Sequence, residues 1–600
     1  MDLWHFLIGR PLKRSEVQHE EIGTTEGLAA LSLDALTSVA YGPEAIVVVL
    51  ATAGAAALPL IVPVTTAIVL LLGVLVLSYM QVIDAYPGGG GAYTVSKENL
   101  GSVFGQVAAA ALIVDYVLTV AVSIAAGGAA LTSAFPALLP WTVPLDLVVL
   151  AIITMMNLRG VAESARAFLL PTVVFILGIL TVILLGWVAP AHAPQGPPPL
   201  PPLSDVIGVA LLLKAFAAGC SALTGVEAIA NSVPLFREPR VRRAKQAELL
   251  LGILLGVMLL GLASLAAHDH IGPRTHQTVL SQVMLAAVGR GWIFYITTVA
   301  TTVALALAAN TSYGSLPVLA SLLARDNLLP HLFAIRGDRL VYQHGIWVLT
   351  ACAALLIILS GGDTNALIPL FAIGVFIGFT LSQAGLVVHW WRGRPRGWLP
   401  RTAINVLGCV ATSAATIVFL FAKFLEGAWV VVVAIPCLVL LFRRIAAYYL
   451  GVRRALTLDG IPPRPVRHRT LVIVPVAGLT RLTVQALSDA QSLGDEVVAV
   501  NVGLDGTENT ELAEAWAKWD PGVRLVTLSS QYYSIVRPLV RFIRSIRERS
   551  DDRIVVLIPE ISPQRWWQNF LHSQMSLMLA AALLAQAKVV VSILPFRPEI

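Results

Sequence analysis

The sequence predicts an all-α polytopic membrane domain of twelve spans, followed by an α/β domain. Three observations support this prediction: an unusually apolar composition, a change in charge density near residue 448, and repeated apolar stretches of membrane-spanning length. Of the 600 residues, 57% are hydrophobic and 13% are charged, and mean hydropathy is +0.79. Soluble domains contain about 25% charged residues, so this composition excludes a water-soluble enzyme for most of the chain.

Charge density divides the chain into three regions. Residues 449–600 carry 17 of the 41 Lys and Arg residues and 14 of the 35 Asp and Glu residues, in about a quarter of the chain. We therefore expect a cytosolic domain at 449–600, a membrane domain at 25–448 and a cytoplasmic leader at 1–24. The leader lacks the apolar core of a signal peptide. The net charge of +6 is explained by basic loops of a membrane protein, so no nucleic-acid partner is predicted.

Twelve apolar stretches approach the roughly 20 residues that a bilayer crossing requires. We expect spans at 27–54, 60–84, 103–132, 141–158, 165–189, 205–233, 247–267, 284–318, 345–360, 365–390, 400–422 and 427–446. With the N-terminus inside, 18 Lys and Arg residues fall in cytoplasmic loops and 3 fall in outer loops. This bias predicts a multi-pass protein of the plasma membrane with both termini in the cytoplasm.

Two of these spans are interrupted near their centres. The first contains SLDALTSVAYGPEAI from Ser32, where Gly42 and Pro43 disrupt helical hydrogen bonding. The sixth contains AAGCSALTGVEAI from Ala217, where Gly225 follows polar residues. Because an odd number of crossings separates the two interruptions, we expect two inverted five-helix repeats with a substrate site at the breaks. The alternative is that these glycines only permit close helix packing.

Four carboxylates fall inside the predicted spans, where a charge at the bilayer centre costs about 2.5–3.5 kcal/mol. They are Asp34, Glu44, Asp115 and Glu227. Such groups face a partner or water, which makes them candidates for the site. Glu44 has a second explanation, because an acidic residue at the start of the second half-helix suits the helix dipole.

The third predicted span carries a polar stripe. Asp115, Thr119 and Ser123 are spaced four residues apart, so their side chains share one helix face. The broken helices would add oxygens opposite this stripe, from Asp34, Tyr41 and Thr224. Carboxylate, hydroxyl and carbonyl oxygens can replace the water shell of a hard cation. Structural roles are the alternative: a serine could satisfy Asp115, and isolated hydroxyls often bond their own helix.

The string LSLDALTSVAYGPEAI resembles the start of the KimA-type potassium importers, a branch of the amino acid–polyamine–organocation superfamily related to the Kup transporters. The resemblance covers essentially the whole chain and implies a LeuT-like fold, a homodimer and proton-coupled potassium uptake without a cofactor. It implies that the potassium ligands are Asp34, Tyr41, Asp115, Thr119, Ser123 and Thr224. A buried carboxylate can also carry a proton; we favour Glu227 for this role, with Asp34 as a second carboxylate.

The tail from Thr470 alternates strand-like and helix-like segments. The strand-like segments are TLVIVPV, EVVAVNV, VRLVTL, RIVVLIP and VVVSILP, which predict a parallel sheet with helices on both faces. The tail resembles a universal-stress-protein-like domain, but it lacks GxGxxG and GxxxxGK[ST] loops, so ATP binding is not supported. We expect it to mediate dimerisation and gating. The family resemblance adds cyclic di-AMP as a regulator; Arg537, Arg541 and Arg544 could hold a phosphate or form a solvated helix face.

Three functions remain open from the sequence. The first is proton-coupled potassium uptake, and the second is a proton-coupled amino acid permease of the same superfamily. The third is a membrane sensor that does not transport. An enzyme is not predicted, because the spans contain no His/Ser/Asp set, and the four cysteines lack the spacing of a disulfide framework or zinc site.

Overall fold

The computed structural model describes most of the chain. The described residues are 22–89, 91–159, 165–188, 208–337, 341–457, 464, 466–503, 506–529, 535–550, 552–562, 575–586 and 589–596. They form two compact units, Met1–Thr457 and Leu458–Ile600. Of the leader predicted at 1–24, residues 1–21 lie outside the described residues.

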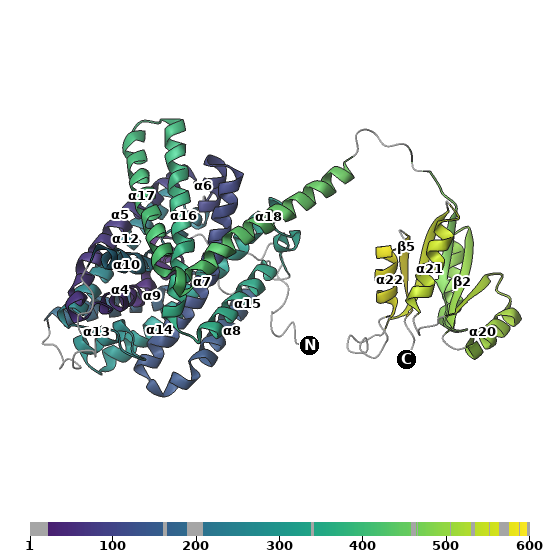
Figure 1. Cartoon of the computed structure of the whole chain (residues 1–600), viewed down its shortest axis with the longest axis horizontal. Coiled ribbons are helices and arrows are strands. Elements are labelled where there is room, and N and C mark those ends of the chain that lie inside the picture. Colours follow the sequence, from purple (N-terminus) through teal and green to yellow (C-terminus); the bar gives the residue numbers. More distant parts are fainter. Residues whose placement is uncertain are drawn as a thin grey trace. The chain divides into compact units, whose positions relative to one another are not determined.

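The first unit is a helical bundle (Figure 1). Within the described residues, twelve helices are long and apolar enough to cross a membrane, which confirms the predicted number of spans. In chain order these are α3–η2–α4 (Leu33–Thr37, Ser38–Ala40, Gly42–Ala51), η3–α5 (Ala55–Leu60, Ile61–Ala85), α7 (Ser102–Ala134), η4–α8 (Pro136–Trp141, Thr142–Leu158), α9 (Ala165–Val188), α10–η6–α11 (Val209–Gly219, Cys220–Leu223, Ala228–Asn231), α12 (Arg240–His268), α14 (Trp292–Arg325), α15 (Gln343–Ser360), α16 (Thr364–Gly393), α17 (Trp398–Lys423) and α18 (Trp429–Leu456).

Shorter elements connect these spans. They are α2 (Thr24–Leu31), α6 (Ala92–Asn99), η7 (Val233–Leu235), α13 (Val279–Val288), η8 (His331–Ala334) and the π-helical turn η9 (Phe424–Ala428). The helix α13 corrects one prediction, since the eighth span was expected to start at 284. Gly289 has φ +63 and ends α13, and α14 begins only at Trp292. Glycine adopts this conformation at little steric cost and so terminates a helix readily.

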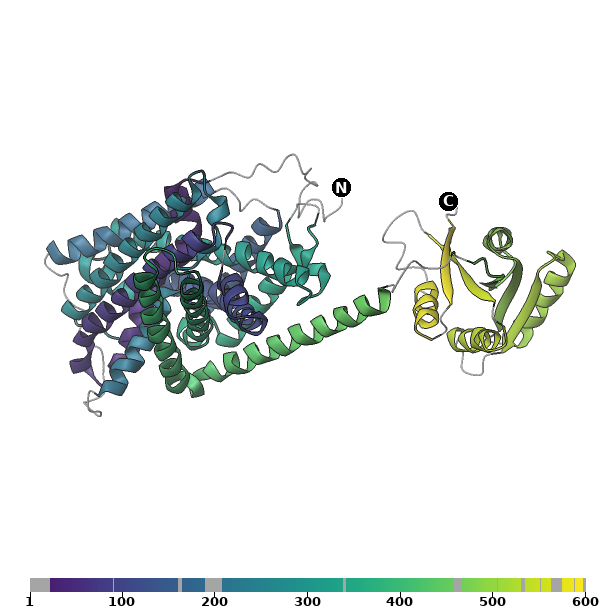
Figure 2. The ribbon, with the colours of Figure 1, turned by 90° about the horizontal axis from the view of Figure 1, so that it is seen from above.

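The helices differ in how deeply they are buried. In α7 72% of the most apolar window is buried, whereas in α18 only 17% is buried. Thus α7 lies at the centre of the bundle and α18 at its periphery. The long helix α18 also projects beyond its neighbours (Figures 1 and 2) and runs to Leu456, past the predicted span end at 446 and the domain boundary expected at 448.

Two long helices occupy corresponding places in the two sets of five spans. The third span is α7, with 33 residues, and the eighth is α14, with 34 residues. They pack against each other, and α14 also contacts α3 of the first broken span. The interrupted spans one and six therefore lie beside a pair of continuous helices.

The second unit contains the predicted parallel sheet. Its strands are β1 (Thr470–Pro475), β2 (Glu496–Gly503), β3 (Arg524–Ser529), β4 (Arg553–Ile561) and β5 (Val590–Phe596), in the order β3-β2-β1-β4-β5. Every pair is parallel. The helices are α19 (Arg481–Leu493), α20 (Gly506–Trp519), α21 (Val536–Arg547) and α22 (Met575–Gln586). This arrangement confirms the α/β prediction.

The central strand β1 explains why the sheet is covered on both faces. Its side chains alternate, so Leu471 and Ile473 pack with α21 and α22, whereas Val472 and Val474 pack with α19 and α20. A strand that is buried on both faces reads as a continuous apolar run. Figure 2 shows helices on both sides of the sheet.

Candidate functional site

The first broken span changes geometry at its centre. The helix α3 ends at Thr37, a single 3-10 turn follows, and Tyr41 has φ −120 and ψ −20. Gly42 and Pro43 were expected to form the interruption, but they are the first residues of α4. Proline is tolerated in the first turn of a helix, where its missing N–H needs no partner. The irregular backbone therefore lies just before these residues.

The sixth span breaks more sharply. After the 3-10 turn η6, Thr224 is extended, with φ −66 and ψ 149, and Gly225 has φ +80. Regular helix resumes only at Ala228. The left-handed conformation of Gly225 is unfavourable for residues with a β-carbon.

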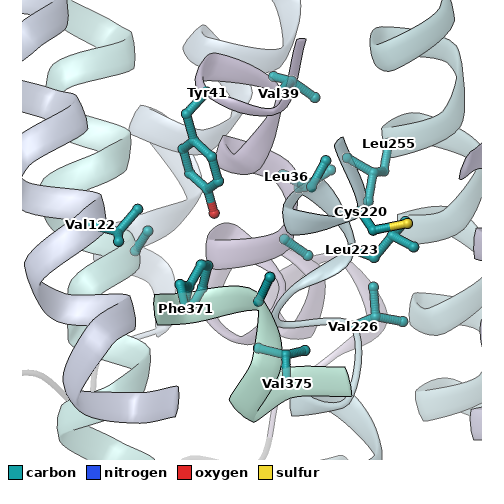
Figure 3. Close-up of a cluster of buried hydrophobic side chains, with 14 of the residues drawn as sticks. Leu36, Val39, Tyr41, Val122, Cys220, Leu223, Val226, Leu255, Phe371 and Val375 are labelled. Atoms are coloured by element: carbon teal, nitrogen blue, oxygen red, sulfur yellow. The ribbon is translucent and has the colours of Figure 1, made fainter. Parts of the chain in front are cut away.

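The two breaks contact each other directly. The Ser38 hydroxyl lies 2.6 Å from the carbonyl oxygen of Ala35 and 2.6 Å from that of Ala222, so it links the two irregular segments. The Tyr41 hydroxyl forms a 3.2 Å hydrogen bond with the Thr224 hydroxyl. In Figure 3 the Tyr41 hydroxyl points into the centre of the packed helices. The two half-helices thus form one unit held by side-chain hydrogen bonds.

Removal of the Ser38 hydroxyl is expected to destabilise this contact. Ser38→Ala leaves the buried Ala222 carbonyl without this donor, and such a loss costs about 1–3 kcal/mol. We expect a lower melting temperature for the purified protein in detergent. Ser264→Ala is the matched control, because the Ser264 hydroxyl donates only to Gly261 of its own helix. Equal melting temperatures for the two variants would contradict the proposed link.

A small cavity lies beside the breaks. It is lined by Asp34, Asp115, Tyr116, Thr119, Gly225, Glu227, Ala228, Asn231, Thr311, Ser312 and Ser315. Its volume is about 10 Å³, which is room for about one water-sized particle. A potassium ion without its hydration shell has a similar size.

Three buried carboxylates surround this cavity. Asp34, Asp115 and Glu227 are 4%, 3% and 5% exposed. In each, one oxygen has no hydrogen-bond partner among the described residues: Oδ1 of Asp34, Oδ1 of Asp115 and Oε2 of Glu227. A buried, uncompensated carboxylate is costly, so these groups require a proton or a cation.

The carboxylates do not converge into a multidentate metal cage. Among the described residues, no group of three His, Cys, Asp or Glu side chains is close enough to hold a metal ion together. Divalent cations in protein sites are usually held by several carboxylates or by carboxylates and phosphates. One or two carboxylates together with hydroxyl oxygens suit a monovalent cation better.

The structure separates the predicted site residues into two groups. Asp34, Asp115, Thr119, Gly225 and Glu227 line the cavity. Tyr41 and Thr224 form the neighbouring hydrogen bond between the breaks, and Ser123 is a buried residue one helical turn beyond Thr119 on α7.

Glu44 lies outside the cavity and has its own partners. Its Oε2 accepts a 3.1 Å hydrogen bond from the Val279 amide, and its Oε1 accepts a 3.2 Å bond from the Asn365 side chain. It therefore ties α4 to the start of α13 and to α16. Glu44 also lies in the first turn of α4, the second half of the broken span, which is the position that the dipole explanation requires.

Several cavity residues were not predicted from the sequence. Three come from α14, namely Thr311, Ser312 and Ser315, and two others are Tyr116 and Asn231. The signal was the polar string ANTSYGS in the middle of an apolar span. The role of this string becomes clear only once α14 is packed against α7, the corresponding helix of the first repeat.

One end of the bundle is rich in basic residues, including Lys97, Arg240, Lys245 and Arg325; we call it the basic end. Here the Tyr93 hydroxyl and Lys97 Nζ both donate to Oδ2 of Asp326, the latter at 2.6 Å. Burial and the nearby Asp326 carboxylate raise the pKa of the Tyr93 phenol, so the phenol stays protonated and donates. These bonds fasten α6 to the end of α14.

A bundle with two centrally interrupted spans around a polar cavity belongs to the class of secondary membrane transporters. Residues 28–442 match the amino acid permease family, and residues 467–596 match the family described as the KimA potassium transporter C-terminal domain. The potassium transporter KimA of Bacillus subtilis (strain 168) is 40% identical over 602 residues, which cover 98% of each chain. The chain therefore belongs to the KimA potassium transporter family within the amino acid permease (APC) superfamily. This is a family of transporters rather than enzymes.

Proposed function

We propose that this protein imports potassium ions together with protons by alternating access. The observation that carries the proposal is that three buried carboxylates, each with an unpartnered oxygen, surround a cavity of one-water size. A dehydrated potassium ion needs oxygen ligands and negative charge, and both are available there. The similarity to a protein named as a potassium transporter supports the same ion.

The proposed ligands come from three helices. Asp34 and Asp115 supply charge, and Thr119 supplies a hydroxyl oxygen within the cavity. Tyr41, Thr224 and Ser123 would complete the ion's path with further hydroxyl oxygens. Because spans one and six are already broken at these residues, a small rotation of the half-helices can open the site to one side at a time.

Proton coupling follows because the cavity has three carboxylates but room for only one monovalent cation. With a potassium ion at Asp34 and Asp115, the neighbouring Glu227 carboxylate remains in dry surroundings, where its charge is costly. A proton on Glu227 removes that charge, and Asp34 can take a proton when the ion leaves. Each bound ion or proton neutralises a buried negative charge. It therefore lowers the free energy needed to change the conformation of the broken helices.

Orientation, assembly and regulation are part of the same proposal. The basic end would face the cytoplasm, which places both termini there. The unit Leu458–Ile600 would join two copies of the chain and regulate transport, with cyclic di-AMP as the regulator that the family resemblance implies. The match of this unit to the KimA C-terminal family supports a role shared within that family.

An amino acid permease is the second candidate, because residues 28–442 match that family. The size of the cavity and its three carboxylates disfavour this substrate, since an α-carboxylate would meet like charges. The test is uptake of rubidium, a potassium substitute, by proteoliposomes with and without a proton gradient. We expect gradient-driven rubidium uptake and thermal stabilisation by potassium chloride but not by a panel of amino acids. Stabilisation by an amino acid alone would favour the permease, and absence of any flux would favour a sensor.

A further inference from the structure

A further buried carboxylate lies about two helical turns from the start of α12, the end of that helix that carries Arg240 and Lys245. Glu248, in α12, is 0% exposed, and neither of its side-chain oxygens has a hydrogen-bond partner among the described residues. The expected ligand set did not include it, because it lies near the end of its span. Full burial of an unpaired carboxylate is costly and requires a compensating proton or partner.

The groups that face Glu248 are acidic or neutral. The helix α12 packs against α5, which carries Tyr79, and against α11, which begins directly after Glu227. Tyr79 is 2% exposed, and its hydroxyl also has no partner in the described part of the chain. The helix α5 also contacts α11. Glu227, Tyr79 and Glu248 therefore place unpartnered oxygens on three different elements that surround one region.

The charged groups on the other elements packed against α12 are accounted for. From α2, Glu26 lies 3.4 Å from Arg237, and from α3, Asp34 belongs to the cavity. From α4, Glu44 is bound to Val279 and Asn365. At the end of α5, Asp84 accepts from Lys245 at 2.8 Å. Lys245, the cationic residue nearest to Glu248 along α12, is thus already paired with Asp84.

We propose that Glu248 receives the transported proton from Glu227 and releases it at the basic end. The inference rests on the proposed proton-coupled function and extends it. It assigns the exit step of the proton to a residue outside the potassium site. Tyr79 is a positioning residue whose unpartnered hydroxyl can hold a water molecule between the two carboxyl groups.

The proton transfer balances without consuming any further reactant. Because these oxygens lie beyond hydrogen-bond distance of one another, the transfer runs through a water molecule. The O–H bond of protonated Glu227 breaks as its proton passes to the water oxygen, while a proton of that water moves to a Glu248 oxygen. The water is neutral before and after the transfer. Glu227 becomes a carboxylate, and Glu248 becomes a neutral acid.

An exit for this proton lies one helical turn away. Lys245 precedes Glu248 by three residues and therefore lies on the same face of α12. The Lys245–Asp84 pair has side chains that are 29% and 30% exposed, so water reaches it. Asn231, which lines the cavity, also packs closely against Gly91, the residue before α6. If Gly91 carried a β-carbon, that atom would lie only 2.7 Å from Oδ1 of Asn231. Asn231 and Glu248 are thus both close to the basic end, where water reaches the Lys245–Asp84 pair.

The test uses the full-length protein in proteoliposomes. Glu248→Gln keeps the shape of the side chain but cannot accept the proton. We expect gradient-driven rubidium uptake to fall by about 100-fold or more, as is usual when a positioned proton-transfer group is lost. Exchange of rubidium for potassium at equal pH on both sides should continue, because the ion site is intact.

Asp146→Asn is the matched control. Asp146 is also buried, at 2% exposure, with an unpartnered Oδ2, but it lies near the opposite end of the bundle. It should keep gradient-driven uptake. Tyr79→Phe retains the edge-on packing on Phe379 and should slow uptake without stopping exchange.

The outcomes separate this inference from the proposed function. If the unaltered protein shows no proton-driven rubidium uptake, the proposed function fails. If it does, and folded Glu248→Gln keeps its uptake or loses exchange as well, the role of Glu248 is wrong. If Glu248→Gln does not fold, Glu248→Asp decides: uptake with a changed pH profile supports the relay, and an unchanged pH profile overturns it.

Discussion

Asp115→Asn is expected to abolish rubidium uptake in cells that lack other potassium uptake systems. The substitution keeps the shape of the side chain and removes one of the negative charges that offset the dehydration of the cation. Loss of one partner of a buried ion pair costs about 3–5 kcal/mol, and each 1.4 kcal/mol weakens binding about tenfold. Uptake should therefore fall by at least about 100-fold at rubidium concentrations well below those that saturate the unaltered protein.

The Asp115 experiment requires evidence that the variant is present and folded. Its amount in the membrane and its melting temperature should equal those of the unaltered protein, since asparagine meets the same neighbours. Asp146→Asn serves again as the control, because it removes a buried carboxylate that does not line the cavity. Near-normal uptake by Asp115→Asn would show that the cavity is not the ion site. The assignment of the fold would not be affected by that result.

The parts of the site that lie on local patterns could be predicted from the sequence. The Asp115 and Thr119 stripe follows from helical periodicity, and the breaks follow from helix-disrupting residues near small polar ones. Both signals depend only on neighbours in the chain. The alternation of strands and helices in the tail is local in the same sense, which is why the parallel sheet was predicted with its five strands.

The parts that depend on packing could not be predicted. Ser312 and Ser315 look like ordinary helix hydroxyls until α14 is placed against α7. Glu248 lies close enough to the end of α12 to pass as a solvated residue, and its burial arises from the packing of α12 against α5. Contacts between helices that are far apart in the chain set both properties, and periodicity carries no information about them.

Gly225→Ala is expected to impair transport for a steric reason. Gly225 has φ +80, a conformation that costs other residues about 1–2 kcal/mol. A β-carbon there would lie 2.7 Å from Oδ2 of Asp34 and 2.9 Å from the backbone nitrogen of Ala35. Because a backbone atom cannot swing away as a side-chain end can, the two broken helices must separate and the Asp34 carboxylate must move from the cavity.

We expect rubidium uptake by Gly225→Ala to fall more than about tenfold and the melting temperature to decrease. Gly73→Ala is the matched control, because Gly73 lies in α5 and a β-carbon there would meet nothing within 4 Å. It should transport normally and melt at an equal or higher temperature, since alanine favours a helix over glycine by about 1 kcal/mol. If both variants transport alike, close contact between the breaks is not needed to form the site. If only Gly225→Ala fails, and higher rubidium concentrations partly restore its uptake, the contact acts by positioning Asp34 for the ion.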